Sequence, residues 1–114
     1  HIDFCGGIKK SIKKCVNYNK VKGKKIPIII EVRNIEELQK VLNVGRVNRI
    51  ILDNFNIKMT KEAVRLTNSK ISLESSGNIT IENIRSYAEC GVNFISVGSL
   101  THSVKSIDLS MLIT

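Results

Sequence analysis

The sequence predicts an α/β fold that forms part of a parallel β/α barrel, roughly its C-terminal half, with four βα units. Four apolar runs recur at intervals of roughly 20–25 residues, which is the length of a strand plus a helix. Helix-spaced apolar positions lie between the runs, and polar residues follow each run. The runs predicted to be strands are Ile26–Ile30, Arg49–Leu52, Lys70–Leu73 and Asn93–Val97.

The chain has 114 residues, which is one domain at most. A complete eight-unit barrel has ~250 residues, so four units make about half of one. The sequence starts at His1 rather than at a methionine. We therefore expect residues 1–114 to be the C-terminal part of a barrel domain, with an N-terminal domain and the first barrel strands outside them. We also expect this part to be inactive alone.

The segment before the first strand has the spacing of a helix. A helix is predicted over Ile8–Val16, with its lysines on the outer face. Its apolar positions are Ile8, Ile12, Cys15 and Val16. Pro27 is expected at the start of the following strand, where a missing N–H matters least. The unbroken Ile28–Ile30 run predicts a strand that is buried on both faces.

The later helices are predicted from their capping residues. Asn34 is a candidate N-cap with Glu37 as its capping-box partner, and Gly45 ends that helix. Thr60 and Thr80 are predicted to cap the next two helices. The resulting order alternates strand and helix along the chain, as a parallel sheet requires.

The composition is that of a globular cytoplasmic protein. The hydrophobic content of 42% suffices for a core, and no apolar stretch approaches the ~20 residues that span a bilayer. We therefore predict no membrane contact. The cysteines are odd in number and lack CxxC spacing, which argues against a disulfide framework and a zinc site. Buried free thiols are expected at Cys5, Cys15 and Cys90.

The net charge of +8 is concentrated near the start of the chain. Eight lysines between Lys9 and Lys25, less Asp3, contribute +7 of it. Such a cluster can mark a surface for a polyanion, so a basic nucleic-acid-binding module is one alternative. However, no aromatic residues that could stack on bases are interleaved with the lysines. We therefore favour a solvated surface and predict no nucleic-acid partner.

Two acidic residues follow neighbouring strands of the predicted sheet. Glu31 comes after the first apolar run and Asp53 after the second. The carboxyl ends of parallel strands meet at one rim, so these carboxylates are expected to lie close together. A pair of carboxylates can hold ribose hydroxyls or a magnesium ion. The alternative for each residue alone is a loop salt bridge or a helix cap.

Small residues follow the last two predicted strands. Ser76, Gly77 and Asn78 precede a helix predicted to begin near Thr80, so main-chain N–H groups and the helix amino terminus could hold a phosphate. A second turn repeats this composition and is followed by a histidine that could donate to the same phosphate. Its candidate residues are Val97, Gly98, Ser99 and His102. The alternatives are an ordinary turn and a structural histidine.

Several of these segments together resemble a known family. The segments that carry the resemblance are Ile30–Val32, Ile51–Phe55, Leu73–Ile79 and Tyr87–Ser103. In order and spacing they are similar to the C-terminal part of quinolinate phosphoribosyltransferase, also called nicotinate-nucleotide pyrophosphorylase (carboxylating). The resemblance covers essentially the whole chain. It implies that residues 1–114 belong to the catalytic domain, and that a catalytic lysine lies just upstream of His1.

The resemblance implies a Mg²⁺-dependent reaction in the biosynthesis of NAD. A phosphoribosyl group passes from phosphoribosyl pyrophosphate to quinolinate, and decarboxylation gives nicotinate mononucleotide. By matching position, Glu31 and Asp53 would be catalytic, contacting the ribose hydroxyls and the metal-pyrophosphate region. The 5′-phosphate would be held by Ser76, Gly77, Asn78, Val97, Gly98, Ser99 and His102.

The resemblance also has limits that bear on function. Asn78 stands where the family commonly has glycine, and a positive φ there would suit glycine better. The cationic pocket for quinolinate lies on segments outside this sequence, and Arg33 and Lys105 do not match it. A homodimer or higher homo-oligomer is implied. A paralogue of different specificity, such as the molybdenum-associated relatives of this family, is a further alternative.

Overall fold

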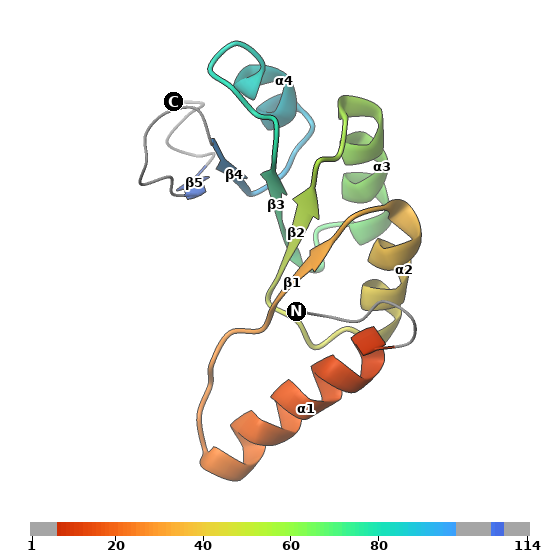
Figure 1. Cartoon of the computed structure of the whole chain (residues 1–114), viewed down its shortest axis with the longest axis vertical. Coiled ribbons are helices and arrows are strands. Elements are labelled where there is room, and N and C mark those ends of the chain that lie inside the picture. Colours follow the sequence, from red (N-terminus) through yellow and green to blue (C-terminus); the bar gives the residue numbers. More distant parts are fainter. Residues whose placement is uncertain (1–6, 98–105, 109–114) are drawn as a thin grey trace.

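The computed structural model describes residues 7–97 and 106–108. Its strands form one sheet in the order β1-β2-β3-β4-β5 (Figure 1). β1 to β4 are parallel and each pairs with the next along the chain, as in a β/α barrel, whereas β5 runs antiparallel to β4. The strands are β1 (Ile29–Val32), β2 (Arg49–Asp53), β3 (Ser72–Ser76), β4 (Phe94–Ser96) and β5 (Ser106–Asp108).

The predicted parallel α/β architecture is confirmed, but two strands were placed wrongly at both ends. β1 spans Ile29–Val32 rather than Ile26–Ile30, and β3 spans Ser72–Ser76 rather than Lys70–Leu73. The apolar-run criterion ended β3 too early because its last residues are polar. It also missed β5, since Ser106–Asp108 contains no apolar run.

Helices cover one side of the parallel sheet. In Figure 1, α2 and α3 stand side by side along the sheet, and α4 lies near the end toward which the parallel strands point. α1 lies at the opposite end, packed against α2. The helices are α1 (Gly7–Lys22), α2 (Ile35–Val44), α3 (Ile57–Thr67) and α4 (Ile84–Glu89).

The two faces of β1 differ in exposure, which corrects the prediction that this strand is buried on both faces. Ile30 and Val32 are buried in the core, whereas Ile29 is 49% exposed. Side chains alternate across a strand, so the buried residues face the helices and Ile29 faces the other side of the sheet. Glu31 shares that second side and is exposed.

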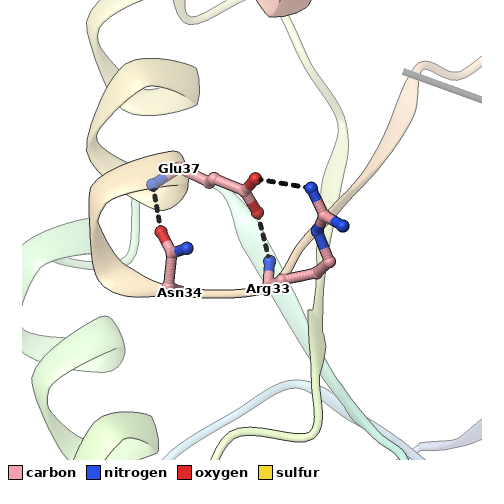
Figure 2. Close-up of polar contacts among 3 residues, drawn as sticks. All are labelled: Arg33, Asn34 and Glu37. Atoms are coloured by element: carbon pink, nitrogen blue, oxygen red, sulfur yellow. Dashed lines mark hydrogen bonds and ion pairs between the residues drawn. The ribbon is translucent and has the colours of Figure 1, made fainter. Parts of the chain in front are cut away.

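The start of α2 confirms the predicted N-cap and refines its capping box (Figure 2). The Asn34 side chain accepts a hydrogen bond from the Glu37 backbone N–H at 2.8 Å. The Glu37 carboxylate reaches back past the cap, accepting from the Arg33 backbone N–H at 2.6 Å and pairing with its guanidinium at 3.2 Å. Glu37 is buried, so these bonds fix the turn that leaves β1.

The two later helix starts were predicted at the wrong residues. α3 begins at Ile57 with Asn56 as its cap, whose side chain accepts from the Met59 N–H at 2.8 Å. Thr60 is buried inside that helix, where its hydroxyl donates to the Asn56 carbonyl. α4 begins at Ile84 rather than near Thr80. Asn is at least as good a cap as Thr, but the prediction considered Thr60 alone for α3.

α1 is longer than predicted and carries most of the lysine cluster. Ile12 is fully buried, and Lys10, Lys13 and Lys14 are exposed. The lysines therefore take the outer face, as predicted. Within residues 7–97 and 106–108, no helix has the length and apolar character needed to cross a bilayer.

The expectation of buried thiols holds for one of the two described cysteines. Cys90 is buried, whereas Cys15 on α1 is exposed although it lies only three residues after the buried Ile12. Cys5 lies outside the described residues.

Candidate functional site

Three predicted site residues share one face of the sheet at the carboxyl ends of their strands. Asp53 on β2 pairs directly with Ser76 on β3, so their side chains point the same way. Glu31 on β1 pairs with Ile51, which lies two residues before Asp53. Strand spacing and rise place the Cα atoms of Glu31 and Asp53 about 8 Å apart. The structure therefore brings these residues to one rim, as predicted.

The turn after β3 has the backbone conformation that small residues favour. Gly77 has a φ of +81° and Asn78 a φ of +44°. A Cβ on Gly77 would lie 2.4 Å from the Asn54 Oδ1 atom, so no larger residue fits there without a shift. Asn78 therefore has the positive φ that glycine, the common residue of the family at this position, would adopt more easily.

The helix contribution to the first phosphate turn was predicted wrongly. α4 begins only at Ile84 and has six residues, so no helix amino terminus follows Asn78 directly. The intervening turn is instead fixed by Asn83, which accepts from the Thr80 N–H at 2.7 Å and donates to the Asn78 carbonyl at 3.0 Å. An anion at this turn would therefore depend on main-chain N–H groups of Ser76–Asn78.

The loop that follows Asp53 is anchored to α4. Tyr87 is buried, and its hydroxyl donates to the Phe55 carbonyl at 2.9 Å. Burial raises the pKa of Tyr87, so the hydroxyl keeps its proton and remains a donor. At the other end of the loop, the Asn54 N–H donates to the Ser76 carbonyl at 2.9 Å. The loops after β2 and β3 are thereby tied together beside Asp53.

A charged cluster missed by the sequence reasoning lies on the same face, one step below the rim. Arg49 on β2 forms an ion pair with Glu74 on β3, with 3.0 Å between Nη1 and Oε1. Ser96 on β4 donates to the other Glu74 oxygen at 2.5 Å. The apolar-run criterion ended β3 at Leu73 and left Glu74 outside it, so the sequence carried no signal of this pairing.

Part of the second predicted phosphate turn lies outside the described residues. Val97 is described and is buried, at 1% exposure. Gly98, Ser99 and His102 fall in the part that the structure does not describe, so their predicted roles stay predictions.

The rim residues fit a magnesium ion in donor type. Mg²⁺ takes oxygen ligands and is usually held by one or two carboxylates together with substrate phosphates and water. Glu31 and Asp53 supply two carboxylates on one face, and neither is fully buried. Among the described residues, no group of three or more His, Cys, Asp or Glu side chains forms a metal cage. A metal shared with a phosphorylated substrate suits this donor set.

Comparison with known proteins places these features in a family. The model of the family described as "Quinolinate phosphoribosyl transferase, C-terminal domain" matches residues 1–112. A chloroplastic nicotinate-nucleotide pyrophosphorylase (carboxylating) of Arabidopsis thaliana is 38% identical over 125 residues, covering 97% of this chain and 36% of the relative. A probable nicotinate-nucleotide pyrophosphorylase (carboxylating) of Bacillus subtilis is 37% identical over 114 residues, covering 100% of this chain and 38% of the relative.

Solved structures give the same similarity. The nicotinate-nucleotide pyrophosphorylase of Ehrlichia chaffeensis aligns with a TM-score of 0.74 at 38% identity, covering 91% of this chain and 36% of that one. The enzyme of the same name from Francisella tularensis aligns with a TM-score of 0.72 at 36% identity, covering 90% of this chain and 35% of that one. The chain thus spans a little over a third of the length of these relatives.

Proposed function

The chain belongs to the quinolinate phosphoribosyltransferase family, and from this premise we propose that the protein transfers a phosphoribosyl group from phosphoribosyl pyrophosphate to quinolinate. Decarboxylation of the adduct then gives nicotinate mononucleotide, with release of pyrophosphate and CO₂. The observation that carries the proposal is the shared rim of Glu31, Asp53 and the Ser76–Asn78 turn. This rim combines carboxylates for a sugar with a turn for a phosphate.

The carboxylates are suited to the charge that develops in the reaction. As the bond to pyrophosphate breaks, positive charge builds on the anomeric carbon and its ring oxygen. Asp53 and Glu31 are fixed on neighbouring strands, so they can stabilise this charge without rearranging. They also accept hydrogen bonds from the ribose hydroxyls. Mg²⁺, when bound with the substrate, neutralises the charge of the leaving pyrophosphate.

The phosphate end of the substrate is assigned to the turns after β3 and β4. The Ser76–Asn78 turn is preorganised by Asn54 and Asn83, so its N–H groups cost little to order around a 5′-phosphate. Val97, Gly98, Ser99 and His102 are proposed to complete the phosphate site from the next turn. The carboxylates of quinolinate are assigned to cationic residues outside this chain.

Two further features of the whole protein are proposed with the activity. We expect it to act as a homodimer or higher homo-oligomer, as the family resemblance implies. We also expect it to act in the cytoplasm, where free cysteines such as Cys15 and Cys90 stay reduced. A relative from Nicotiana tabacum is named as mitochondrial, so fractionation of cells is the direct test of location.

The activity is tested by mixing the intact protein with quinolinate, phosphoribosyl pyrophosphate and Mg²⁺. The expected result is release of pyrophosphate and formation of nicotinate mononucleotide, both of which require quinolinate. A parallel reaction with nicotinate in place of quinolinate tests the alternative of a paralogue with another acceptor. Phosphoribosyl transfer to nicotinate alone, or no transfer at all, would overturn the proposal.

A further inference from the structure

Asn54, the residue directly after Asp53, has no role in the proposed reaction so far. It follows the end of β2 and is exposed, and its φ is +58°. This left-handed conformation is unfavourable for most L-residues, although asparagine adopts it more readily than most. The chain therefore turns out of the strand at the residue beside the carboxylate on which the proposed function depends.

The backbone around Asn54 is held from two sides. Its N–H donates to the Ser76 carbonyl at 2.9 Å, one step beyond the last registered pair of β2 and β3, which is Asp53 with Ser76. The next residue, Phe55, is buried, and its carbonyl accepts from the Tyr87 hydroxyl at 2.9 Å. Because the backbone is fixed before and after it, the Asn54 side chain can take few directions although it is exposed.

The Asn54 amide lies between the Asp53 carboxylate and the turn after β3. Its Nδ2 atom donates to the Asp53 Oδ1 atom at 3.3 Å. Its Oδ1 atom lies over Gly77, in the space that the Cβ of a larger residue would occupy. One side chain therefore lies against both the residue assigned to the ribose and the turn assigned to the 5′-phosphate.

A single donor matters at Asp53 because this residue has few other partners. Asp53 is half-buried, and within the described part of the chain its side chain forms no ion pair with a cation. The terminal torsion of an aspartate is broad, so an unrestrained carboxylate rotates easily. A donor at Oδ1 limits this rotation and leaves Oδ2 available for a substrate. A charge that is already oriented stabilises a transition state without a cost of reorganisation.

We propose that Asn54 is a positioning residue for phosphoribosyl transfer, acting through Asp53, whose carboxylate its amide orients for the ribose of phosphoribosyl pyrophosphate. The inference rests on the proposed function, since it assigns the ribose to Asp53. The left-handed backbone and the close fit over Gly77 set the direction of the amide, and the amide sets the direction of the carboxylate. Asn54 itself needs no contact with the substrate.

The test is Asn54→Gly in the intact protein, made alone and together with Asp53→Asn. Glycine accepts the positive φ and keeps the N–H that donates to Ser76, but it removes the amide. The kcat is expected to fall at least about fivefold, while the Kd of phosphoribosyl pyrophosphate from titration calorimetry changes less than about twofold, because orientation rather than a binding contact is lost. When Asp53→Asn is already present, Asn54→Gly is expected to change kcat less than about twofold.

Asn68→Gly is the matched control. Asn68 is also exposed and has a positive φ of +50°, at the C-cap of α3. It precedes the start of β3, so it lies at the end of the sheet away from the rim. The substitution is expected to leave kcat and Kd unchanged.

Asn54→Asp is a second variant at the same position. It keeps the size of the side chain but replaces the donor with a carboxylate that repels Asp53, so kcat is expected to fall at least as far as in Asn54→Gly. If Asn54→Gly does not fold, Asn54→Asp decides the question.

Three outcomes would overturn the inference while the wild-type protein is active. They are a wild-type kcat in Asn54→Gly, an equal loss in Asn68→Gly, and an equal loss with and without Asp53→Asn. Each of them leaves the proposed function standing. Wild-type protein that transfers no phosphoribosyl group to quinolinate refutes the proposed function, and the inference with it.

Discussion

Asp53 and Glu31 are the residues on which the proposed function depends. They lie on one face at neighbouring strand ends, and neither has an ion pair with a cation among the described residues. The side chain of Asp53 accepts from Asn54 at 3.3 Å, which leaves most of its acceptor capacity open. The loop-salt-bridge alternative for these residues therefore has no support in the described part of the chain.

Neutralising either carboxylate is predicted to lower the activity. Asp53→Asn and Glu31→Gln in the intact protein should each lower kcat/KM at least roughly tenfold, or ~1.4 kcal/mol of transition-state stabilisation, without loss of the fold. Steady-state kinetics measures the first effect and circular dichroism the second. Glu36→Gln, an exposed residue on α2, serves as the control and should be silent. Wild-type kinetics in both rim variants would remove them from the site.

Asn78 offers a second test on a single residue. Its φ of +44° lies in the region that costs other L-residues roughly 1–2 kcal/mol, although asparagine tolerates it better than most. Asn78→Gly should raise the free energy of unfolding by about 0.5 kcal/mol after the greater entropy loss of glycine is counted. Asn78→Val should lower it by at least about 1 kcal/mol. Urea unfolding measures both, and changes of the same sign would contradict this explanation.

The order of the elements was predictable from the sequence, but not all of their ends were. Apolar periodicity located β1 to β4 and the helices between them, because burial against the helices demands it. It could not find the end of β3, where the polar residues Glu74 and Ser76 lie on the side of the sheet away from the helices. Nor could it choose between two good caps, such as Asn56 and Thr60, since tertiary packing buries the threonine.

The N-cap of α2 is predicted to contribute to the stability of the fold. Asn34→Ala removes the acceptor for the Glu37 N–H and loosens the arrangement in Figure 2, so it should lower the free energy of unfolding by about 1 kcal/mol. Asn43→Ala makes the same change at an exposed position in the same helix and should have no such effect. Chemical denaturation of the intact protein measures both. Similar losses in the two variants would show that the cap is not the cause.

At the scale of the whole molecule, the strand order explains why the sequence predicted the position of the candidate site. It did not predict the contacts that hold the surrounding residues. Parallel order brings Glu31, Asp53 and Ser76 to one rim wherever the loops go. Contacts between distant segments, such as Tyr87 with Phe55 and Arg49 with Glu74, depend on register and packing. No local pattern contains that information. The sequence therefore indicated the rim without the residues that support it.

The two described cysteines report on opening of the whole molecule. Burial raises the pKa of the Cys90 thiol, so little reactive thiolate is present at neutral pH. Iodoacetamide at pH 7 should label the exposed Cys15 while Cys90 reacts at least about tenfold more slowly than in urea. Raising the pH toward the elevated pKa should speed the labelling of Cys90. Peptide mass spectrometry resolves each site, and rapid native labelling of Cys90 would contradict its placement in the core.

Gly77 and Asn54 approach so closely that substitutions at position 77 depend on the residue at position 54. A side chain at position 77 has room only if position 54 loses its amide, and the two turns also share the hydrogen bond from the Asn54 N–H to the Ser76 carbonyl. A library that varies position 77 while Asn54 is kept is therefore expected to be rich in misfolded members. Grafting either loop from a relative requires that both be transplanted together.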